Sequence, residues 1–262
     1  MAMSKRILVR GKAFGDDEGP LVCIPLVGRT ADAIRAELES VISAGADLIE
    51  WRADFFSEIG DSRAVLGLAR ELATTASGVP LIFTIRSAAE GGQPIPLTVE
   101  QVSRLCADVC STGSMGLVDT EMSTEPHCID IVRTAARGSE TLLILSFHDF
   151  TSTPDTDALF RKFVRAQELG GDVAKVAVMP QTPADVLALL DATLRAHTEL
   201  DLPLISMSMG PLGVLTRAAG WMFGSSVTFA AGVGRSAPGQ LPVADLNKIV
   251  GILREALQQV GQ

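Results

Sequence analysis

The chain has 262 residues, is 47% hydrophobic and carries a formal net charge of −9. This acidic balance, without a basic block, argues against nucleic acid or an anionic membrane as a partner, although a small anionic substrate stays compatible with it. No apolar run approaches the roughly 20 residues that a membrane span needs, and the N-terminal residues lack the pattern of a signal peptide. We therefore expect a cytoplasmic globular protein.

The four cysteines point to the same compartment. Cys106 and Cys110 lie four residues apart in a helical pattern, and no second pair of Cys or His at zinc spacing accompanies them. We expect these two, with Cys23 and Cys128, to be reduced thiols that pack as small buried hydrophobes.

Short apolar runs alternate with longer segments of helical periodicity along the whole chain. The runs predict eight strands, at residues 21–28, 46–54, 80–87, 116–122, 141–149, 173–180, 203–210 and 226–232. Because they are apolar almost throughout, they are typical of parallel strands that are covered on both faces.

Helix start and stop signals occupy the gaps between these strands. Threonines precede three amphipathic segments as candidate N-caps: Thr30, Thr98 and Thr182. Gly170 and Gly224 follow two further segments, the second of which predicts a helix over 213–223. A last helical segment covers 242–260.

The strict alternation predicts an α/β fold, the (β/α)8 TIM barrel. Residues 1–20 predict a short N-terminal β-hairpin that closes the barrel floor. The barrel then covers 21–262, which allows about 30 residues for each βα repeat, and the chain 1–262 forms one domain. An open, doubly wound sheet is the alternative on pattern alone.

Charged residues gather where the predicted strands end, at Glu50, Arg52, Arg86, Asp119, Glu121, His148 and Asp149. In a (β/α)8 barrel the carboxyl ends of the strands form the active-site face. Such side chains are rarely buried without partners. The cluster therefore predicts either an active site or an internal ion-pair network that supports the barrel.

Lys175 lies in an otherwise apolar strand. Burial and nearby cations lower the pKa of a lysine, and the resulting neutral amine is a nucleophile toward carbonyl groups. The alternative is a structural lysine paired with an internal carboxylate. His148 ends the preceding strand and can move protons near neutral pH, so the two residues together predict imine chemistry.

Seven segments, in their order and spacing, closely resemble type I 3-dehydroquinate dehydratase: LIEWRADFF, LIFTIRSAAEGG, ILSFHDF, GGDVAKVAVMPQTPADVLALL, ISMSMGPLGVLTR, FGSSVTFA and SAPGQLPVADL. The resemblance runs from about residue 20 to the end. It implies a (β/α)8 barrel that dehydrates 3-dehydroquinate to 3-dehydroshikimate in the shikimate pathway through a lysine imine, with no metal or organic cofactor. It also implies a homodimer.

The resemblance assigns roles to residues within these motifs. It makes Lys175 the Schiff-base lysine and His148 the general acid and base, with Glu90 close to His148 to tune it. Nine residues would bind the substrate: Glu50, Arg52, Arg86, Arg217, Ser236, Gln240, Met207, Phe229 and Ala237. Arg217, with Ser236 and Gln240, would hold the substrate carboxylate and ring hydroxyls, and the loop after the eighth strand would close as a lid.

Two positions depart from the family pattern. Pro25 stands where relatives commonly have a serine near the substrate, and Arg235 stands where lysine is familiar. Three competing hypotheses stay open: a class I aldolase, a non-catalytic binder of shikimate-type acids, and a metal-dependent barrel enzyme that uses Asp119, Glu121 and His148.

Overall fold

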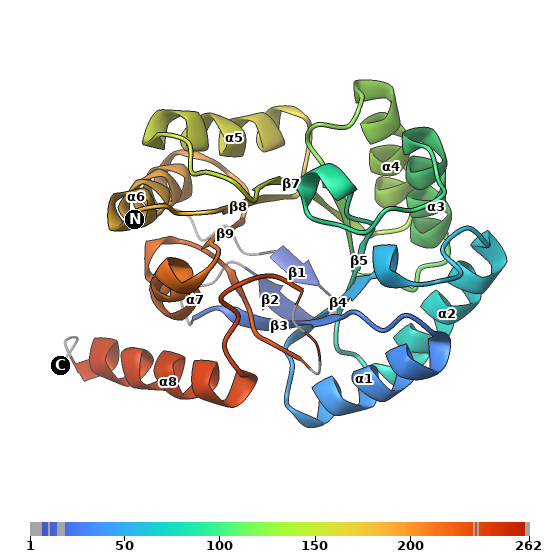
Figure 1. Cartoon of the computed structure of the whole chain (residues 1–262), viewed down its shortest axis with the longest axis horizontal. Coiled ribbons are helices and arrows are strands. Elements are labelled where there is room, and N and C mark those ends of the chain that lie inside the picture. Colours follow the sequence, from blue (N-terminus) through green and yellow to red (C-terminus); the bar gives the residue numbers. More distant parts are fainter. Residues whose placement is uncertain (1–6, 10, 15–18, 233, 235, 260–262) are drawn as a thin grey trace.

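Eight parallel strands form a closed ring in the computed structural model, which describes residues 7–9, 11–14, 19–232, 234 and 236–259. Around the ring the strands follow the order β10-β3-β4-β5-β6-β7-β8-β9, and a parallel bridge between Leu204 and Ser225 joins the two ends. Figure 1 shows the helices arranged around these strands. The predicted (β/α)8 barrel is confirmed, and the open doubly wound alternative is wrong.

Each barrel strand lies within one of the eight predicted ranges. The strands are β3 (Leu21–Leu26), β4 (Leu48–Arg52), β5 (Leu81–Thr84), β6 (Leu117–Glu121), β7 (Leu142–Asp149), β8 (Val173–Val178), β9 (Leu204–Ser208) and β10 (Val227–Phe229). All are parallel to their neighbours, and Ser146 of β7 pairs with Lys175 of β8. This register places alternate side chains of neighbouring strands on the same inner face.

Helices follow the strands as the sequence predicts. They are α1 (Ala31–Ser43), α2 (Ser62–Thr75), α3 (Val99–Ser111), α4 (Pro126–Gly138), α5 (Thr156–Glu168), α6 (Pro183–Glu199), α7 (Val214–Ala219) and α8 (Val243–Gln259). Thr30 caps α1, and Thr98 and Thr182 form capping boxes on α3 and α6. Within the described part of the chain, no helix has the length and apolarity needed to cross a membrane.

The predicted single helix over 213–223 is wrong in detail. It is divided into the 3-10 turn η3 (Pro211–Gly213), the short α7, and a second 3-10 turn η4 (Gly220–Phe223). The Thr228 hydroxyl donates to the Arg217 carbonyl, and the Ser225 amide donates to the Gly220 carbonyl. The first bond ties α7 to β10, and the second closes the turn that leads from η4 to β10.

An antiparallel hairpin covers the amino-terminal end of the barrel (Figure 1). Its strands are β1 (Ile7–Val9) and β2 (Lys12–Phe14), and Val9 and Phe14 pack against interior residues from the start of the barrel strands. The predicted floor hairpin is therefore confirmed. All four cysteines are buried and free, as expected.

Candidate active site

A small cavity lies at the carboxyl ends of the barrel strands. All twelve residues predicted for catalysis and substrate binding line it: Lys175, His148, Glu90, Glu50, Arg52, Arg86, Arg217, Ser236, Gln240, Met207, Phe229 and Ala237. Phe150, Ala177 and Met209 also line it and were not predicted, although each lies at or near the end of a predicted strand. The cavity volume of about 40 Å³ is enough for a few waters, so a ring-sized molecule requires the walls to move.

Lys175 is buried and is held by two carboxylates. Its ammonium lies 2.9 Å from Asp119 Oδ2 and 3.2 Å from Glu50 Oε1, and 4.9 Å from the centre of the Phe229 ring. Burial opposes the charged form, but Asp119 and Glu50 outweigh it and raise the pKa of Lys175. The lowered pKa that we expected for Lys175 is therefore wrong. Its contacts are those of the alternative that the sequence left open, a lysine paired with internal carboxylates.

Arg86 joins the carboxylates of β6 to the cavity. It donates to Asp119 Oδ1 at 2.7 Å, to Glu121 Oε1 at 3.1 Å and to Ser146 Oγ at 2.9 Å. Burial alone would lower the pKa of Arg86, but Asp119, Glu121 and Glu90 raise it. Arg86 was predicted to contact substrate, yet most of its donors are already engaged by protein groups.

His148 and Glu90 form the second functional pair. Glu90 Oε2 lies 3.0 Å from His148 Nδ1 and accepts a bond of 2.9 Å from the His148 amide. Burial, and then the charge of Glu121, raise the pKa of Glu90 to about 7. Burial, Arg86 and Lys175 lower the pKa of His148 well below its usual range, so the imidazole is neutral. The predicted proximity of Glu90 and His148 agrees with this geometry.

Two glycines fix the turn that presents Glu90. Gly91 has a φ of +86°, and a Cβ atom there would collide with the ring of Phe150. A Cβ atom on Gly92 would collide with the carbonyl oxygen of Arg86. The backbone at both positions therefore needs glycine, which explains why EGG follows the predicted third strand.

The arginines of the cavity differ in their partners. Arg52 forms a bidentate pair with Asp54, at 2.8 and 2.9 Å. Arg217 is 1% exposed and donates only to backbone carbonyls apart from a long contact to a sulfur: Phe229 O at 3.3 Å and Pro238 O at 3.0 Å. Its Nε has no partner, and no carboxylate pairs with it among the residues described. Burial lowers the pKa of Arg217 to about 10.

The loop after β10 is tied to this arginine. Ser236 and Gln240 bind each other, through the Ser236 amide to Gln240 Oε1 at 3.0 Å and through Gln240 Nε2 to Ser236 Oγ at 3.1 Å. Pro238, between them, supplies the carbonyl that Arg217 binds. Arg235 lies outside the described residues, and closure of this loop as a lid stays a prediction.

Pro25 and two of the three proposed metal ligands, Asp119 and Glu121, take no part in the lining of the catalytic cavity, whereas the third, His148, lines it. Pro25 is buried in β3, in register with Glu50, and does not line it. Across the described ranges, no group of three or more His, Cys, Asp or Glu side chains is arranged to hold a metal ion. The oxygens of Asp119 instead accept from Arg86 and Lys175.

The fold and the cavity define the protein as a (β/α)8-barrel enzyme that acts on a small molecule. The model of the type I 3-dehydroquinase family matches residues 22–256. A 3-dehydroquinate dehydratase of Albidiferax ferrireducens is 50% identical over 98% of this chain and 97% of its own. The chain belongs to the type I 3-dehydroquinase family and is an enzyme of the hydro-lyase class.

Solved structures of other family members have the same fold. The 3-dehydroquinate dehydratase of Geobacillus kaustophilus superposes with a TM-score of 0.94 at 45% identity, covering 97% of this chain and 99% of that one. The type I enzyme of Clostridium difficile, described with covalently modified comenic acid, gives 0.93 at 36% identity, covering 97% and 100%.

Proposed function

We propose that this protein dehydrates 3-dehydroquinate to 3-dehydroshikimate through an imine on Lys175. The lysine nitrogen attacks the ketone carbon, and the carbonyl oxygen leaves as water. A base removes a proton from the neighbouring carbon, the hydroxyl group one carbon further leaves with a proton as water, and hydrolysis of the imine consumes one water. The net change is loss of one water from the substrate.

Arg217 carries this proposal, because it is a buried guanidinium that lacks an anion in the same cavity as Lys175. A buried charge without a partner is unfavourable, and a planar guanidinium fits a carboxylate through two parallel hydrogen bonds. The carboxylate of the substrate supplies the missing partner. With the substrate held there, the ketone is directed toward the inner face of the barrel, where Lys175 lies.

Proton transfer starts from a charged lysine. Asp119 and Glu50 keep Lys175 protonated until the substrate arrives, so the ammonium must lose a proton before it attacks. His148 is neutral and lies on the neighbouring strand, and the negative charge of the bound substrate raises its pKa, so that it can accept this proton. An ionised Glu90 holds the proton of His148 on Nδ1 and leaves Nε2 as the base.

The same imidazole then serves the later steps. His148 removes the proton next to the imine carbon and returns a proton to the departing hydroxyl. The imine withdraws electrons from that carbon, which makes the proton acidic enough for a neutral base. Covalently modified comenic acid on the Clostridium difficile relative supports a family site that reacts covalently.

Borohydride reduction tests the proposal. The protein is incubated with 3-dehydroquinate, reduced, digested and mapped by mass spectrometry, with Lys175→Ala as the matched control. We expect one adduct on the peptide that contains Lys175 and none in the control. An adduct elsewhere, or turnover without any adduct, would contradict the mechanism, and cleavage of a carbon–carbon bond in a retro-aldol assay would favour the aldolase.

The resemblance also supports three further proposals: a cytoplasmic location, a homodimer, and closure of the loop around Ser236. Sedimentation velocity at several concentrations tests the dimer. Hydrogen exchange of the loop amides, with and without substrate, tests closure, and equal exchange in both states would contradict it.

A further inference from the structure

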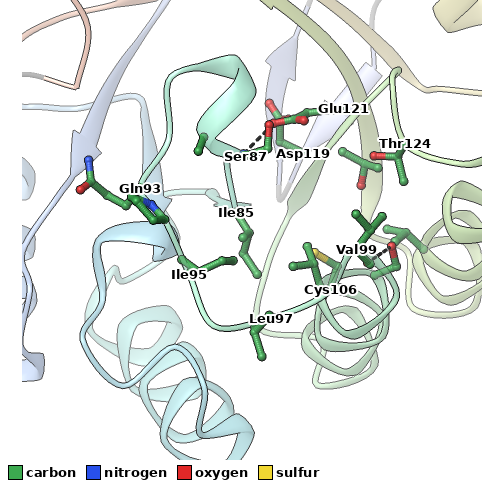
Figure 2. Close-up of a pocket in the computed structure, with 16 residues that line it drawn as sticks. Ile85, Ser87, Gln93, Ile95, Leu97, Val99, Cys106, Asp119, Glu121 and Thr124 are labelled. Carbon is green, nitrogen blue, oxygen red and sulfur yellow. Dashed lines mark hydrogen bonds between the residues drawn. The ribbon is translucent and has the colours of Figure 1, made fainter.

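A second, larger cavity lies between the barrel wall and its helix layer. Its volume is about 280 Å³, and it is lined by β6, α3, α4 and the segment that leads from β5 to α3 (Figure 2). It shares no lining residue with the catalytic cavity. Most of its wall is apolar and includes Ile85, Ile95, Leu97, Val102, Cys106 and Val132. An apolar cavity of about 150 Å³ holds benzene, so this one accommodates about two fused rings.

Within the described part of the chain, the wall contains one buried polar atom without a partner and one carboxylate oxygen that accepts no hydrogen bond from the protein. Thr120 is 8% exposed, and its Oγ1 makes no hydrogen bond. Glu121 accepts from the Ser87 amide and from Arg86 on Oε1, while its Oε2, in a side chain that is 10% exposed, accepts from no described residue. Figure 2 shows Glu121 beside Asp119, with a dashed line for its bond to Ser87. Native structures rarely leave a buried hydroxyl such as that of Thr120 without a partner.

These two atoms specify the polar group of a ligand. The Thr120 hydroxyl can donate or accept, whereas a carboxylate oxygen of Glu121 can only accept, so a ligand group that both accepts and donates satisfies the two. A hydroxyl does this. Glu121 would repel a carboxylate on the ligand. Arg86 disfavours an ammonium on the ligand, because its guanidinium already lies 3.1 Å from the Glu121 carboxylate.

We propose that this cavity is a second ligand site, which takes a small neutral aromatic alcohol. Its hydroxyl lies between Thr120 and Glu121, and its rings lie against the apolar wall. Burial raises the pKa of the Cys106 thiol, so that wall residue stays protonated and contributes only contact. Of the other hydroxyl residues in the wall, Ser103 donates to the Val99 carbonyl at 3.0 Å, and Ser87 Oγ accepts from the Glu90 amide at 3.2 Å.

Titration calorimetry with 2-naphthol tests the site in the full chain. We expect saturable one-to-one binding with a dissociation constant on the order of 0.1 mM. Val102→Trp fills the second cavity and should abolish binding. Ala237→Leu fills the catalytic cavity by a similar change and should leave the affinity of 2-naphthol within twofold of native, whatever it does to turnover.

Thr120→Val keeps the shape of the site and removes only the hydroxyl. It should weaken binding about fivefold, because a net hydrogen bond contributes about 1 kcal/mol. It also keeps the test decisive if Val102→Trp does not fold. Unsaturable binding, equal affinity in Thr120→Val, or loss of binding in Ala237→Leu would each overturn the proposal, and none of them depends on imine chemistry at Lys175.

Discussion

Replacement of Arg217 by methionine separates the binding role of this residue from its role in the fold. Burial lowers the Arg217 pKa to about 10, which corresponds to roughly 3 kcal/mol of unfavourable desolvation at about 1.4 kcal/mol per pKa unit. The change also removes the bonds to the carbonyls of Phe229 and Pro238, each about 1.5 kcal/mol for a charged donor. These contributions nearly cancel, so the melting temperature should move by less than about 3 °C.

Catalysis should respond much more strongly. A guanidinium and a carboxylate about 4 Å apart attract by about 4 kcal/mol at an effective dielectric constant of 20. Loss of that attraction predicts a decrease in kcat/KM of roughly 1000-fold, measured by following formation of the conjugated product in ultraviolet light. Because the attraction acts on the bound substrate before reaction, much of the loss should be in KM.

Arg52→Met is the matched control, because Arg52 lines the same cavity but has a carboxylate partner. It leaves the buried Asp54 carboxylate without its cation and, among the described residues, with only the backbone amides of Arg86 and Gln93 as donors. This should cost about 3 kcal/mol of stability and lower the melting temperature by on the order of 10 °C. Two results would refute the assignment of Arg217 as an unpaired cation that binds the substrate carboxylate. One is that Arg217→Met destabilises the protein as much as Arg52→Met, and the other is that it keeps the native kcat/KM.

Three further predictions concern the remaining machinery. Protonation of Glu90, whose pKa is about 7, removes the anion that orients His148, so kcat/KM should fall as the pH drops through about 7. Glu90→Gln should lose this dependence on pH. If kcat/KM of that variant still fell through the same pH range, Glu90 would not be the titrating group. Lys175→Ala should abolish turnover, while equilibrium dialysis still detects substrate binding. His148→Ala should turn over very slowly and accumulate an imine that borohydride traps. Fast turnover by either variant would contradict these roles. Gly92→Ala should lower the urea midpoint of unfolding, because its Cβ atom meets the Arg86 carbonyl, and Gly67→Ala, where a Cβ atom meets nothing, is the control.

The sequence predicts the barrel and the lysine–histidine pair well, for a physical reason. Parallel strands buried on both faces are apolar almost throughout, so a charged residue in or after one of them stands out. Lys175 and His148 are found in this way. Arg217 is not, because it lies on the short α7, where a basic residue in a helix is unremarkable. Only the resemblance located it.

The pKa of Lys175 could not be predicted because its determinants are distant in the chain. Asp119 lies 56 residues away and Glu50 lies 125 residues away. Their carboxylates reach the ammonium only after the strands close into a ring. The second cavity escaped prediction for a related reason, since its volume depends on how α3 and α4 pack against β6, and composition does not encode such gaps.

The charges around the catalytic cavity have a consequence for proton uptake. Four cations line or border it, Arg52, Arg86, Lys175 and Arg217, and four carboxylates accompany them, Glu50, Asp54, Asp119 and Glu121. The remaining carboxyl group, Glu90, is close to half-protonated at neutral pH. A bound substrate anion adds one negative charge and raises the pKa of Glu90 further. Binding of the substrate near pH 7 is therefore linked to the uptake of a proton. As the pH is lowered, kcat should begin to fall at a higher pH than kcat/KM does, because kcat reports the pKa of Glu90 in the substrate complex.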